Sequence, residues 1–454
     1  MRSCFNPREL SDFARYYGFH YDSLDPMALV KEVLVDMERG LAGLSSSLPM
    51  IPSYITPVSK VPPGKAVLAL DAGGTNLRAS RVHFDEDGKA VTQGTAKHSM
   101  PGTKGRVNAE QFFDHIAEAA LPALDLNSAT SNIEGIGFTF SYPMEIQSNA
   151  DGILTSFSKE VDAPDVVGKA IGAGLREALA RKGYTYDGPI VLLNDTVATL
   201  LSGLAAIPIH GSTEPSKNIY GVDGGPVIGF ILGTGFNTAY PETSIPKIGF
   251  ESKTAPQIVV CETGTFNLRY QGPLDRGFDQ GTKNPGTYAL EKATSGAYLG
   301  PLNLHILKQA VKDKVIRFKK SEEFLALTQI ETKTLNEFCR TPLTGEGPLG
   351  SLFGPNEGDA LAAIQYLISI VTERGALFAA AVLAALVERM QADCEPYAPV
   401  RIAVEGTTYV LYKGMRRALE SWLHMMLVKE RPRAYVITPV EQASLFGAAV
   451  AALR

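Results

Sequence analysis

The chain has 454 residues, more than one hydrophobic core usually supports, so we expect two domains with a ligand-binding cleft between them. It carries 43 Lys and Arg against 48 Asp and Glu, a formal charge of −5, and contains no long basic run that could neutralise a row of phosphates. The composition therefore argues against nucleic acid as the main partner.

The four cysteines are far apart and lack the CxxC or Cys/His spacing of a zinc site, so we expect free thiols in a reducing compartment. The first residues, MRSCFNPRELSDFARYYGF, lack the apolar stretch and cleavage site of a secretory signal, which predicts a cytoplasmic protein. The apolar run from Gly375 to Val387 is too short to cross a bilayer and is flanked by charges, so we expect a buried helix.

Residues 1–64 show a helical pattern that gives way to a loop rich in Pro and Ser. From Ala66 onward strands alternate with helices: VLALDAGGTNLRASRVHF predicts strand, turn and strand, and IEGIGFTFSYP and GPIVLLNDT predict further strands. Helices are expected over 108–124 and 164–181 between them. This alternation predicts an α/β domain with a largely covered sheet.

The second half begins in the same way, because GPVIGFILGTGFNTAYPE again predicts strand, glycine turn and strand. This internal repetition indicates two related halves. Residues 286–345 and 356–394 are expected to be mainly helical, RIAVEGTT to be a strand entering a glycine turn, and EQASLFGAAVAALR to be a closing helix.

The first candidate site is the turn Asp71-Ala72-Gly73-Gly74-Thr75-Asn76, with Arg78 following. Adjacent glycines permit positive φ and remove Cβ atoms, so backbone N–H groups can converge on a phosphate. Asp71, at a strand end, could hold Mg²⁺ directly or through water. An ordinary hairpin turn would explain the same residues.

The second turn, Gly233-Thr234-Gly235, follows another apolar strand and allows the same argument. A nucleoside triphosphate held between two domains needs backbone donors from both sides, so the pair of turns favours a nucleotide site. The sequence has no GxxxxGK[ST] loop, no GxGxxG opening a helix and no HRD or DFG segment. These absences argue against P-loop, Rossmann and protein-kinase chemistry.

Asp195, after the strand IVLL, is the candidate general base. A sugar hydroxyl is a poor nucleophile, so a kinase needs a carboxylate within hydrogen-bond reach to accept its proton. The alternative is that Asp195 caps a helix beginning near Val197, with Thr196 assisting.

Polar residues in apolar strands or beside glycines are candidates for binding a polyhydroxylated ligand, which needs several paired donors and acceptors. They are Ser141, Ser158, Lys159, Glu262 and Glu291. Each of them could equally be an ordinary surface residue. Glu405-Gly406-Thr407 and the late helix with Ser444 could admit an adenine ring and its ribose, or could simply be packing residues.

Together these segments resemble the hexokinase family from about residue 65 to the C-terminus. LALDAGGTNLR and IGFILGTGFNTAY are similar to its two phosphate motifs, GFTFSYP and SFSK to its sugar loops, LLNDTVATL to its catalytic motif, and LEKATSGAYLG to a further family segment. The resemblance implies a general base at Asp195, a catalytic role for Lys159 as well, and sugar contacts from Ser141, Ser158, Lys159, Asn194, Asp195, Asn237, Glu262 and Glu291. It also implies ATP contacts from Asp71, Gly73, Gly74, Thr75, Asn76, Arg78, Gly233, Thr234, Gly406, Thr407 and Ser444.

The fold that this resemblance implies is the two-lobed, actin-like α/β architecture with a cleft. Its small lobe would comprise 65–196 plus 441–454, and its large lobe 1–64 plus 197–440. The cofactors would be ATP and Mg²⁺, and the acceptor a hexose such as glucose. Two other functions stay open: a sugar sensor without catalysis, and an ATP-driven chaperone or cytoskeletal relative of the same fold. The sequence leaves the preferred hexose and the oligomeric state undecided.

Overall fold

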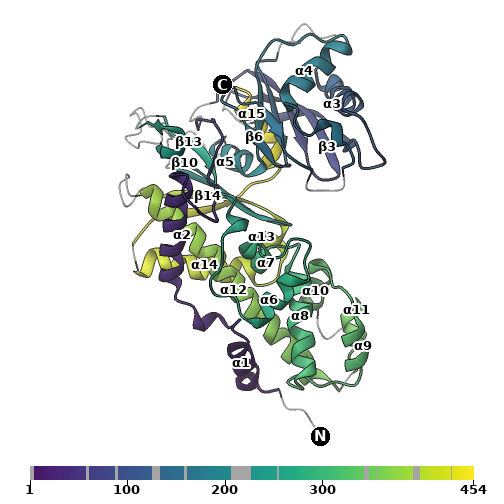
Figure 1. Cartoon of the computed structure of the whole chain (residues 1–454), viewed down its shortest axis with the longest axis vertical. Coiled ribbons are helices and arrows are strands. Elements are labelled where there is room, and N and C mark those ends of the chain that lie inside the picture. The colour runs from purple at the N-terminus through teal and green to yellow at the C-terminus, as the bar shows by residue number, and fades with distance from the viewer. Residues whose placement is uncertain are drawn as a thin grey trace.

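The computed structural model describes residues 5–57, 61–86, 90–124, 133–157, 161–205, 226–252, 255–341, 347–354, 356–391, 399–430 and 432–453. Figure 1 shows two lobes, one built on a five-stranded sheet and a longer one built on a six-stranded sheet with many helices below it. The two-lobed α/β architecture expected from the sequence is confirmed. The expected lobe boundaries stay a prediction.

The five-stranded sheet of the upper lobe has the order β4-β3-β2-β5-β8. Its central strand β2 pairs antiparallel with β3 and parallel with β5, and β8 extends the sheet in parallel. Leu68 and Leu70 of β2 join one hydrophobic core, whereas Val67 and Ala69 join another. Successive side chains of a strand point to opposite faces, so β2 reads as an uninterrupted apolar run because both faces of its sheet are covered. The strands are β2 (Ala66–Ala72), β3 (Asn76–Phe84), β4 (Ala90–Ser99), β5 (Ile136–Phe140) and β8 (Ile190–Leu193).

The six-stranded sheet of the lower lobe has the order β1-β13-β10-β9-β14-β15. Its strand β9 pairs antiparallel with β10 and parallel with β14, which repeats the pattern of β2 with β3 and β5. The internal repetition seen in the sequence is therefore a repetition of topology. These strands are β1 (Ile51–Pro52), β9 (Val227–Leu232), β10 (Phe236–Glu242), β13 (Gln257–Val260), β14 (Val400–Glu405) and β15 (Tyr435–Pro439).

The longest helix, α12 (Gly358–Gln391), lies in the middle of the lower lobe and packs against α2 and α14. By length and composition it could cross a membrane, but 94% of its apolar window is buried inside the protein, as expected of a core helix. The other helices are α1 (Pro7–Tyr16), α2 (Pro26–Leu41), α3 (Ala109–Leu124), α4 (Ile171–Arg181), α5 (Asp195–Ala205), α6 (Pro273–Gln280), α7 (Ala289–Thr294), α8 (Leu299–Lys312), α9 (Ser321–Ala326), α10 (Thr332–Arg340), α11 (Gly347–Gly350), α13 (Thr407–Leu411), α14 (Met415–His424) and α15 (Ala443–Ala451). Short elements are β6 (Met144–Ile146), β7 (Gly152–Leu154), β11 (Ser244–Ile245), β12 (Phe250–Glu251) and a π-helical turn η5 (Met425–Glu430), together with 3₁₀ turns.

Two helices, α5 and α15, pack against each other between the two sheets and share one hydrophobic core with both. Glycines allow this close approach. A Cβ on Gly137 of β5 would lie 1.8 Å from the Ala448 carbonyl oxygen, and one on Gly447 would lie 2.0 Å from the Ala198 carbonyl oxygen. The N-terminus of α5, which begins at Asp195, is thus held firmly where the lobes meet.

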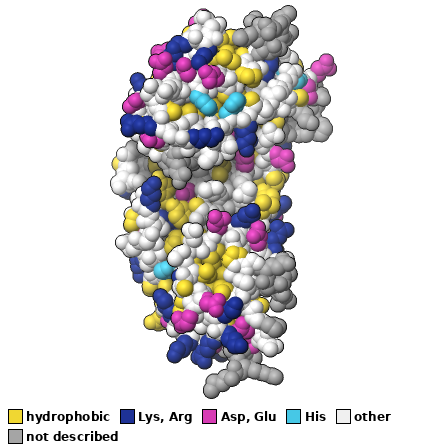
Figure 2. Space-filling model, turned by 90° about the vertical axis from the view of Figure 1, so that its right-hand side faces the viewer, with side chains coloured by type: hydrophobic (Ala, Val, Ile, Leu, Met, Phe, Trp, Pro, Cys, Tyr) yellow, Lys and Arg dark blue, Asp and Glu magenta, His cyan; other side chains and the backbone are white. Residues whose placement is uncertain are grey.

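Figure 2 shows one face of the molecule, on which basic and acidic side chains are interspersed. Cys261 and Cys339 are buried free thiols, as expected, and Cys4 and Cys394 lie outside the described residues.

Candidate active site

Asp195 is the first residue of α5, directly after β8. The sequence placed the start of this helix near Val197, so the expected boundary was wrong by two residues. The capping role falls to the preceding side chain, since Asn194 Oδ1 accepts a hydrogen bond from the Thr196 N–H at 2.8 Å. The Asp195 carboxylate instead accepts the Thr196 hydroxyl at 3.2 Å. The printed cap bond thus belongs to Asn194, and the Asp195 carboxylate stands at the start of the helix.

Asn237, near the start of β10, and Glu262, which follows the neighbouring strand β13, lie side by side. Asn237 Nδ2 donates to Glu262 Oε1 at 2.9 Å, while Asn237 Oδ1 accepts the backbone N–H groups of Thr238 and Thr263 at 2.8 and 3.3 Å. Glu262 has a left-handed backbone with φ of 55°, unusual for a residue with a side chain. The backbone bend and the Asn237 amide fix the direction in which this carboxyl points.

Glu291, on α7, is anchored to the second glycine turn. Its Oε2 accepts the backbone N–H of Phe236 at 3.1 Å, and a Cβ on Gly235 would lie 2.9 Å from the same oxygen. Glu291 thus occupies the space that a side chain at position 235 would need.

Three carboxylates expected to bind sugar or take its proton are close enough to repel one another. Burial first, and then the negative charges of Asp195 and Glu291, raise the pKa of Glu262 from 4.5 to about 7, although the hydrogen bond from Asn237 acts in the opposite direction. Burial also raises the pKa of Glu291. Tyr288 precedes α7 and has a φ of 56°. Burial, and then the negative charges of Glu262 and Glu291, raise its pKa. Sequence reasoning missed Tyr288, which lies just before the segment LEKATSGAYLG.

The first glycine turn connects β2 and β3 and is supported from the next strand. Asp71 and Arg78 face each other across the antiparallel pair, and Arg78 Nε donates to Asp71 Oδ2 at 2.8 Å. Tyr142 Oη donates to the carbonyl oxygens of Gly73 and Gly74 at 2.9 and 3.3 Å. These bonds turn the carbonyl groups of the bend toward Tyr142.

The residues after these glycines extend the turn into the third strand. Asn76 Nδ2 donates to Thr75 Oγ1 at 3.0 Å, and both side chains are exposed. The Thr75 carbonyl accepts the Met100 N–H at 2.9 Å.

The second glycine turn is held from behind by α13. Thr408 Oγ1 donates to the Gly233 carbonyl at 2.7 Å, and a Cβ on Gly233 would lie 3.3 Å from the Gly406 Cα. Gly73, Gly233 and Gly235 do not use the positive φ that glycine permits, whereas Gly406 has φ of 132°. Close approach of other atoms explains the glycines at positions 233 and 235.

A pocket of about 540 Å³ opens beside the second turn and is lined by Thr234 and Thr407 together with residues of α10. Thr332, Lys333 and Asn336 belong to this lining, and sequence reasoning missed them because their segment shows only a helical pattern. The size and position of the pocket suit a nucleoside attached to phosphates at the turns.

Glu405 is the last residue of β14, directly before Gly406. Burial and, to a smaller extent, the charges of Asp195 and Asp71 raise its pKa to about 7. Glu405 was noted in the sequence only as a neighbour of Gly406. Its electrostatic interaction with Asp195 and Asp71 brings candidate residues from both lobes near one place.

The comparisons with known proteins agree with this arrangement. Two family models, both described as Hexokinase, match residues 10–205 and 227–454. Hexokinase-5 of Oryza sativa subsp. japonica is 30% identical over 94% of this chain and 86% of its own length. The chain belongs to the hexokinase family. Human Hexokinase-3 is 29% identical over 89% of this chain but only 43% of its own length, so the chain spans less than half of that relative.

Solved structures show that the fold is shared as well. A hexokinase from Schistosoma mansoni complexed with glucose superposes with a TM-score of 0.75 at 23% identity, covering 99% of this chain and 100% of the other. A second hexokinase crystal structure gives 0.69 at 25% identity, covering 98% of this chain and 96% of the other.

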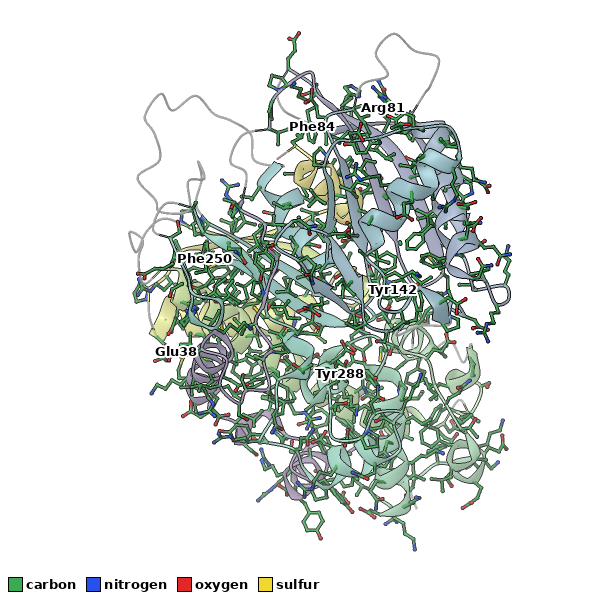
Figure 3. The ribbon with its side chains drawn as sticks, turned by 45° about the horizontal axis from the view of Figure 1, so that its top comes forward. Glu38, Arg81, Phe84, Tyr142, Phe250 and Tyr288 are labelled. Carbon is green, nitrogen blue, oxygen red and sulfur yellow. The ribbon has the colours of Figure 1, made fainter. Side chains whose placement is uncertain are left out.

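The structure gives fewer contacts for the four remaining serine and lysine residues that the resemblance to hexokinases singled out. Ser158 and Lys159 lie outside the described residues. The Ser141 backbone N–H donates to the Ala72 carbonyl at 3.0 Å, next to the first turn. The Ser444 carbonyl accepts the Thr139 hydroxyl at 2.7 Å, which ties the start of α15 to β5. Figure 3 labels Tyr142 and Tyr288, which come from the upper and lower lobes and lie near the level at which the lobes meet.

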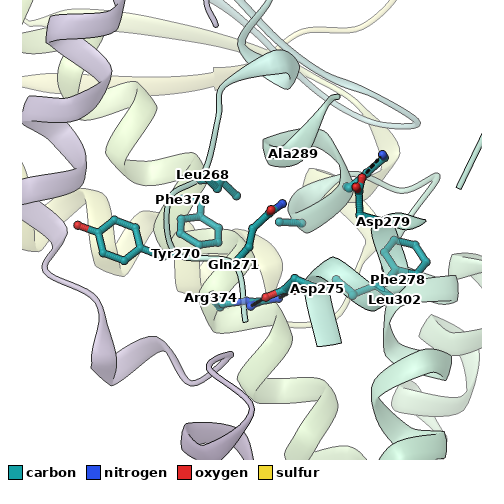
Figure 4. A pocket seen from close by; sticks show the side chains of 12 residues that line it. Leu268, Tyr270, Gln271, Asp275, Phe278, Asp279, Ala289, Leu302, Arg374 and Phe378 are labelled. Carbon is teal, nitrogen blue, oxygen red and sulfur yellow. Dashed lines mark hydrogen bonds and ion pairs between the residues drawn. The ribbon is translucent and has the colours of Figure 1, made fainter. Parts of the chain in front are cut away.

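Two buried ion pairs support the helix that carries Glu291 in this hexokinase fold. Asp275 and Asp279, four residues apart on α6, pair with Arg374 of α12 and Lys292 of α7 respectively. Figure 4 shows both pairs around a small cavity beneath α7. Arg374 donates to both oxygens of Asp275 at 2.7 Å, and Lys292 Nζ also donates to the Asn284 carbonyl at 2.7 Å. Because Lys292 follows Glu291 directly, the pair with Asp279 ties α7 to α6, and the pair of Asp275 with Arg374 ties α6 in turn to α12.

Proposed function

We propose that this chain transfers the γ-phosphoryl group of ATP to the 6-hydroxyl of a hexose, with glucose as the acceptor and Asp195 as the general base. The observation that carries the proposal is the position of Asp195: its charge reaches Glu262 on the sugar side and Glu405 on the nucleotide side. Membership of the hexokinase family and a fold shared with a glucose-bound hexokinase support it.

In the proposed reaction Asp195 accepts the proton of the hexose hydroxyl as the new O–P bond forms. The bond between the γ-phosphorus and the bridging β–γ oxygen breaks, ADP leaves, and the proton remains on Asp195 until it passes to solvent. Asp195 stands at the N-terminus of α5, where the positive end of the helix dipole favours negative charge. General-base help of this kind contributes typically ~10²–10⁴-fold.

The sugar would be held by the carboxyl and amide groups around Asn237. Glu262 and Glu291 each already accept one hydrogen bond from the protein, which leaves their remaining oxygens to accept sugar hydroxyls. A hexose that fails to pair with such a buried group loses about 1–3 kcal/mol, so these residues would discriminate between epimers. Asn194, Ser141, Ser158 and Lys159 complete the proposed sugar set.

The nucleotide phosphates would lie between the two glycine turns, and the nucleoside in the pocket lined by Thr234 and Thr407. The charges of Asp71 and Asp195 both raise the pKa of Glu405, and a Mg²⁺ ion held near Asp71, directly or through water, would relieve that repulsion. Asp71 also pairs with Arg78, and the described residues include no cluster of three His, Cys, Asp or Glu side chains that could hold a metal, so the ATP phosphates would have to supply further ligands. That cation would neutralise charge on the transferring phosphoryl group. Closure of the lobes around the sugar would exclude water as a competing acceptor.

The test is a panel of hexoses with ATP and Mg²⁺, measuring kcat/KM by a coupled assay for ADP. We expect glucose to be phosphorylated, and Asp195→Ala to lower kcat about 10²–10⁴-fold while hexose binding, measured by calorimetry, persists. The matched control is Asp187→Ala, which removes an exposed aspartate of the same lobe and should change neither quantity. Near-normal turnover in Asp195→Ala would refute the assignment of the base. Hexose binding without any turnover in the unmodified chain would favour the sugar sensor.

A further inference from the structure

A second groove lies on the lower lobe next to the nucleotide pocket. It has a volume of about 890 Å³, larger than the pocket of about 540 Å³, and it is formed mainly by α13, α14 and η5. Its charged and apolar lining residues are Arg340, Lys413, Arg416, Arg417, Lys429, Glu420, His424, Val410, Leu411 and Tyr435.

The charge of this groove is opposite to that of the whole chain. Five Lys and Arg side chains line it against one carboxylate, Glu420, whereas the chain as a whole has a formal charge of −5. Glu420 is already engaged, because its Oε1 accepts Tyr409 Oη at 2.7 Å and Arg416 Nε at 2.8 Å. Arg417 Nη2 also lies 3.8 Å from Glu373 Oε1, so two of the five cations already face a carboxylate and the positive surplus rests on Arg340, Lys413 and Lys429, which favours an anionic ligand.

The groove is also apolar along one side. Val410 and Leu411, consecutive on α13, are each 55% exposed and line it together. Exposed large apolar side chains in a concave, charged lining are typical of sites that bind a ligand with both apolar and charged parts.

The groove and the nucleotide pocket share the wall formed by α13. Leu411 and Tyr412 line both, and Thr408 of the same helix donates to the Gly233 carbonyl of the second glycine turn at 2.7 Å. A ligand that shifts α13 from the groove side would therefore change the position of the groups that face the nucleotide.

We propose that this groove binds a small organic anion that carries phosphate or carboxylate groups beside an apolar part, and that its occupancy changes the affinity of the neighbouring pocket for nucleotide. The binding stands on the groove alone, whereas the effect on nucleotide rests on the proposed kinase function. The two parts are therefore tested by separate measurements.

The binding test uses 8-anilinonaphthalene-1-sulfonate, an apolar anion whose fluorescence rises when it binds. The variant Arg340→Gln/Arg417→Gln/Lys429→Gln removes three groove charges but leaves Arg416 and Lys413, whose side chains donate to Glu420 and the Cys339 carbonyl. We expect the unmodified chain to bind one equivalent, and the variant to bind at least tenfold more weakly. The control Lys31→Gln/Lys312→Gln/Lys319→Gln removes three exposed lysines elsewhere and should bind like the unmodified chain. Equal binding by all three proteins would overturn the proposal.

The coupling test measures the same titration with and without a saturating non-hydrolysable ATP analogue. We expect the probe to remain bound with a dissociation constant changed at least twofold, and by reciprocity the probe to change the affinity for the analogue by the same factor. Complete displacement of the probe by the analogue would show that it occupies the nucleotide pocket, and would overturn the assignment to the groove. Since neither measurement requires turnover, a failure of the proposed kinase reaction would leave the binding result intact.

Discussion

We predict that removing the charge of Glu262 makes the folded protein more stable and weakens its binding of hexose. Burial and the charges of Asp195 and Glu291 raise its pKa from 4.5 to about 7, so the folded protein keeps this carboxyl protonated at pH values where the unfolded chain does not. Between about pH 4.5 and 7 the folded state binds more protons than the unfolded state, and stability contributed by this group falls as pH rises. Above pH 7 the loss is complete and amounts to at most about 3 kcal/mol.

The substitution Glu262→Gln keeps the shape and the oxygen that accepts Asn237 Nδ2, but removes the charge. We therefore expect it to raise the free energy of unfolding at pH 8 by up to about 3 kcal/mol and to change it little at pH 4.5 or below. The assay is thermal or urea unfolding from pH 4.5 to 8.5 without sugar, followed by circular dichroism. Glu145→Gln, at an exposed position, is the control. The same variant should bind hexose more weakly. A stability difference that does not depend on pH would refute the reasoning.

Two further substitutions test how the site is supported. Gly137→Ala places a Cβ 1.8 Å from the Ala448 carbonyl oxygen, so it should destabilise the protein by several kcal/mol or prevent folding. The control Gly358→Ala, with open space around it, should not destabilise the protein. Equal melting temperatures for the two variants would contradict the close packing at Gly137. Lys292→Met leaves Asp279 buried without its partner and should cost about 3–5 kcal/mol, with a raised KM for hexose. The added change Asp279→Asn should recover part of both losses in unfolding and steady-state kinetics; no recovery would mean that the ion pair does not support α7.

The strands and turns of the site were predictable because they follow short-range rules. Buried strands read as apolar runs, and Asp71 and Asp195 stand where two such runs end. The strands β2, β5 and β8 are parallel neighbours, so both residues lie at the same edge of the upper sheet. Strand β4 was missed because its sequence, AVTQGTAKHS, is mostly polar, and it forms only by pairing along β3 at the edge of the sheet.

Long-range contacts explain what could not be predicted. Nothing local distinguishes Lys333 and Asn336 from other surface residues of α10; they line the proposed nucleotide pocket only because α10 lies beside α13 in the fold, where Asn336 Nδ2 donates to the Leu411 carbonyl. The exact start of α5 was missed for a smaller reason, because Asn194 and Asp195 are both good capping residues and only the geometry decides between them.

The position of α15 has a consequence for how the protein is made. Leu445, Ala448 and Val450 of this last helix cover the face of the upper sheet formed by Val67 and Ala69. About half of the chain lies between α5 and α15, so a ribosome must synthesise the lower lobe before this face is covered. The upper lobe should therefore pass through an intermediate with an apolar sheet face exposed, and it is at this stage of synthesis that the protein most needs protection from aggregation.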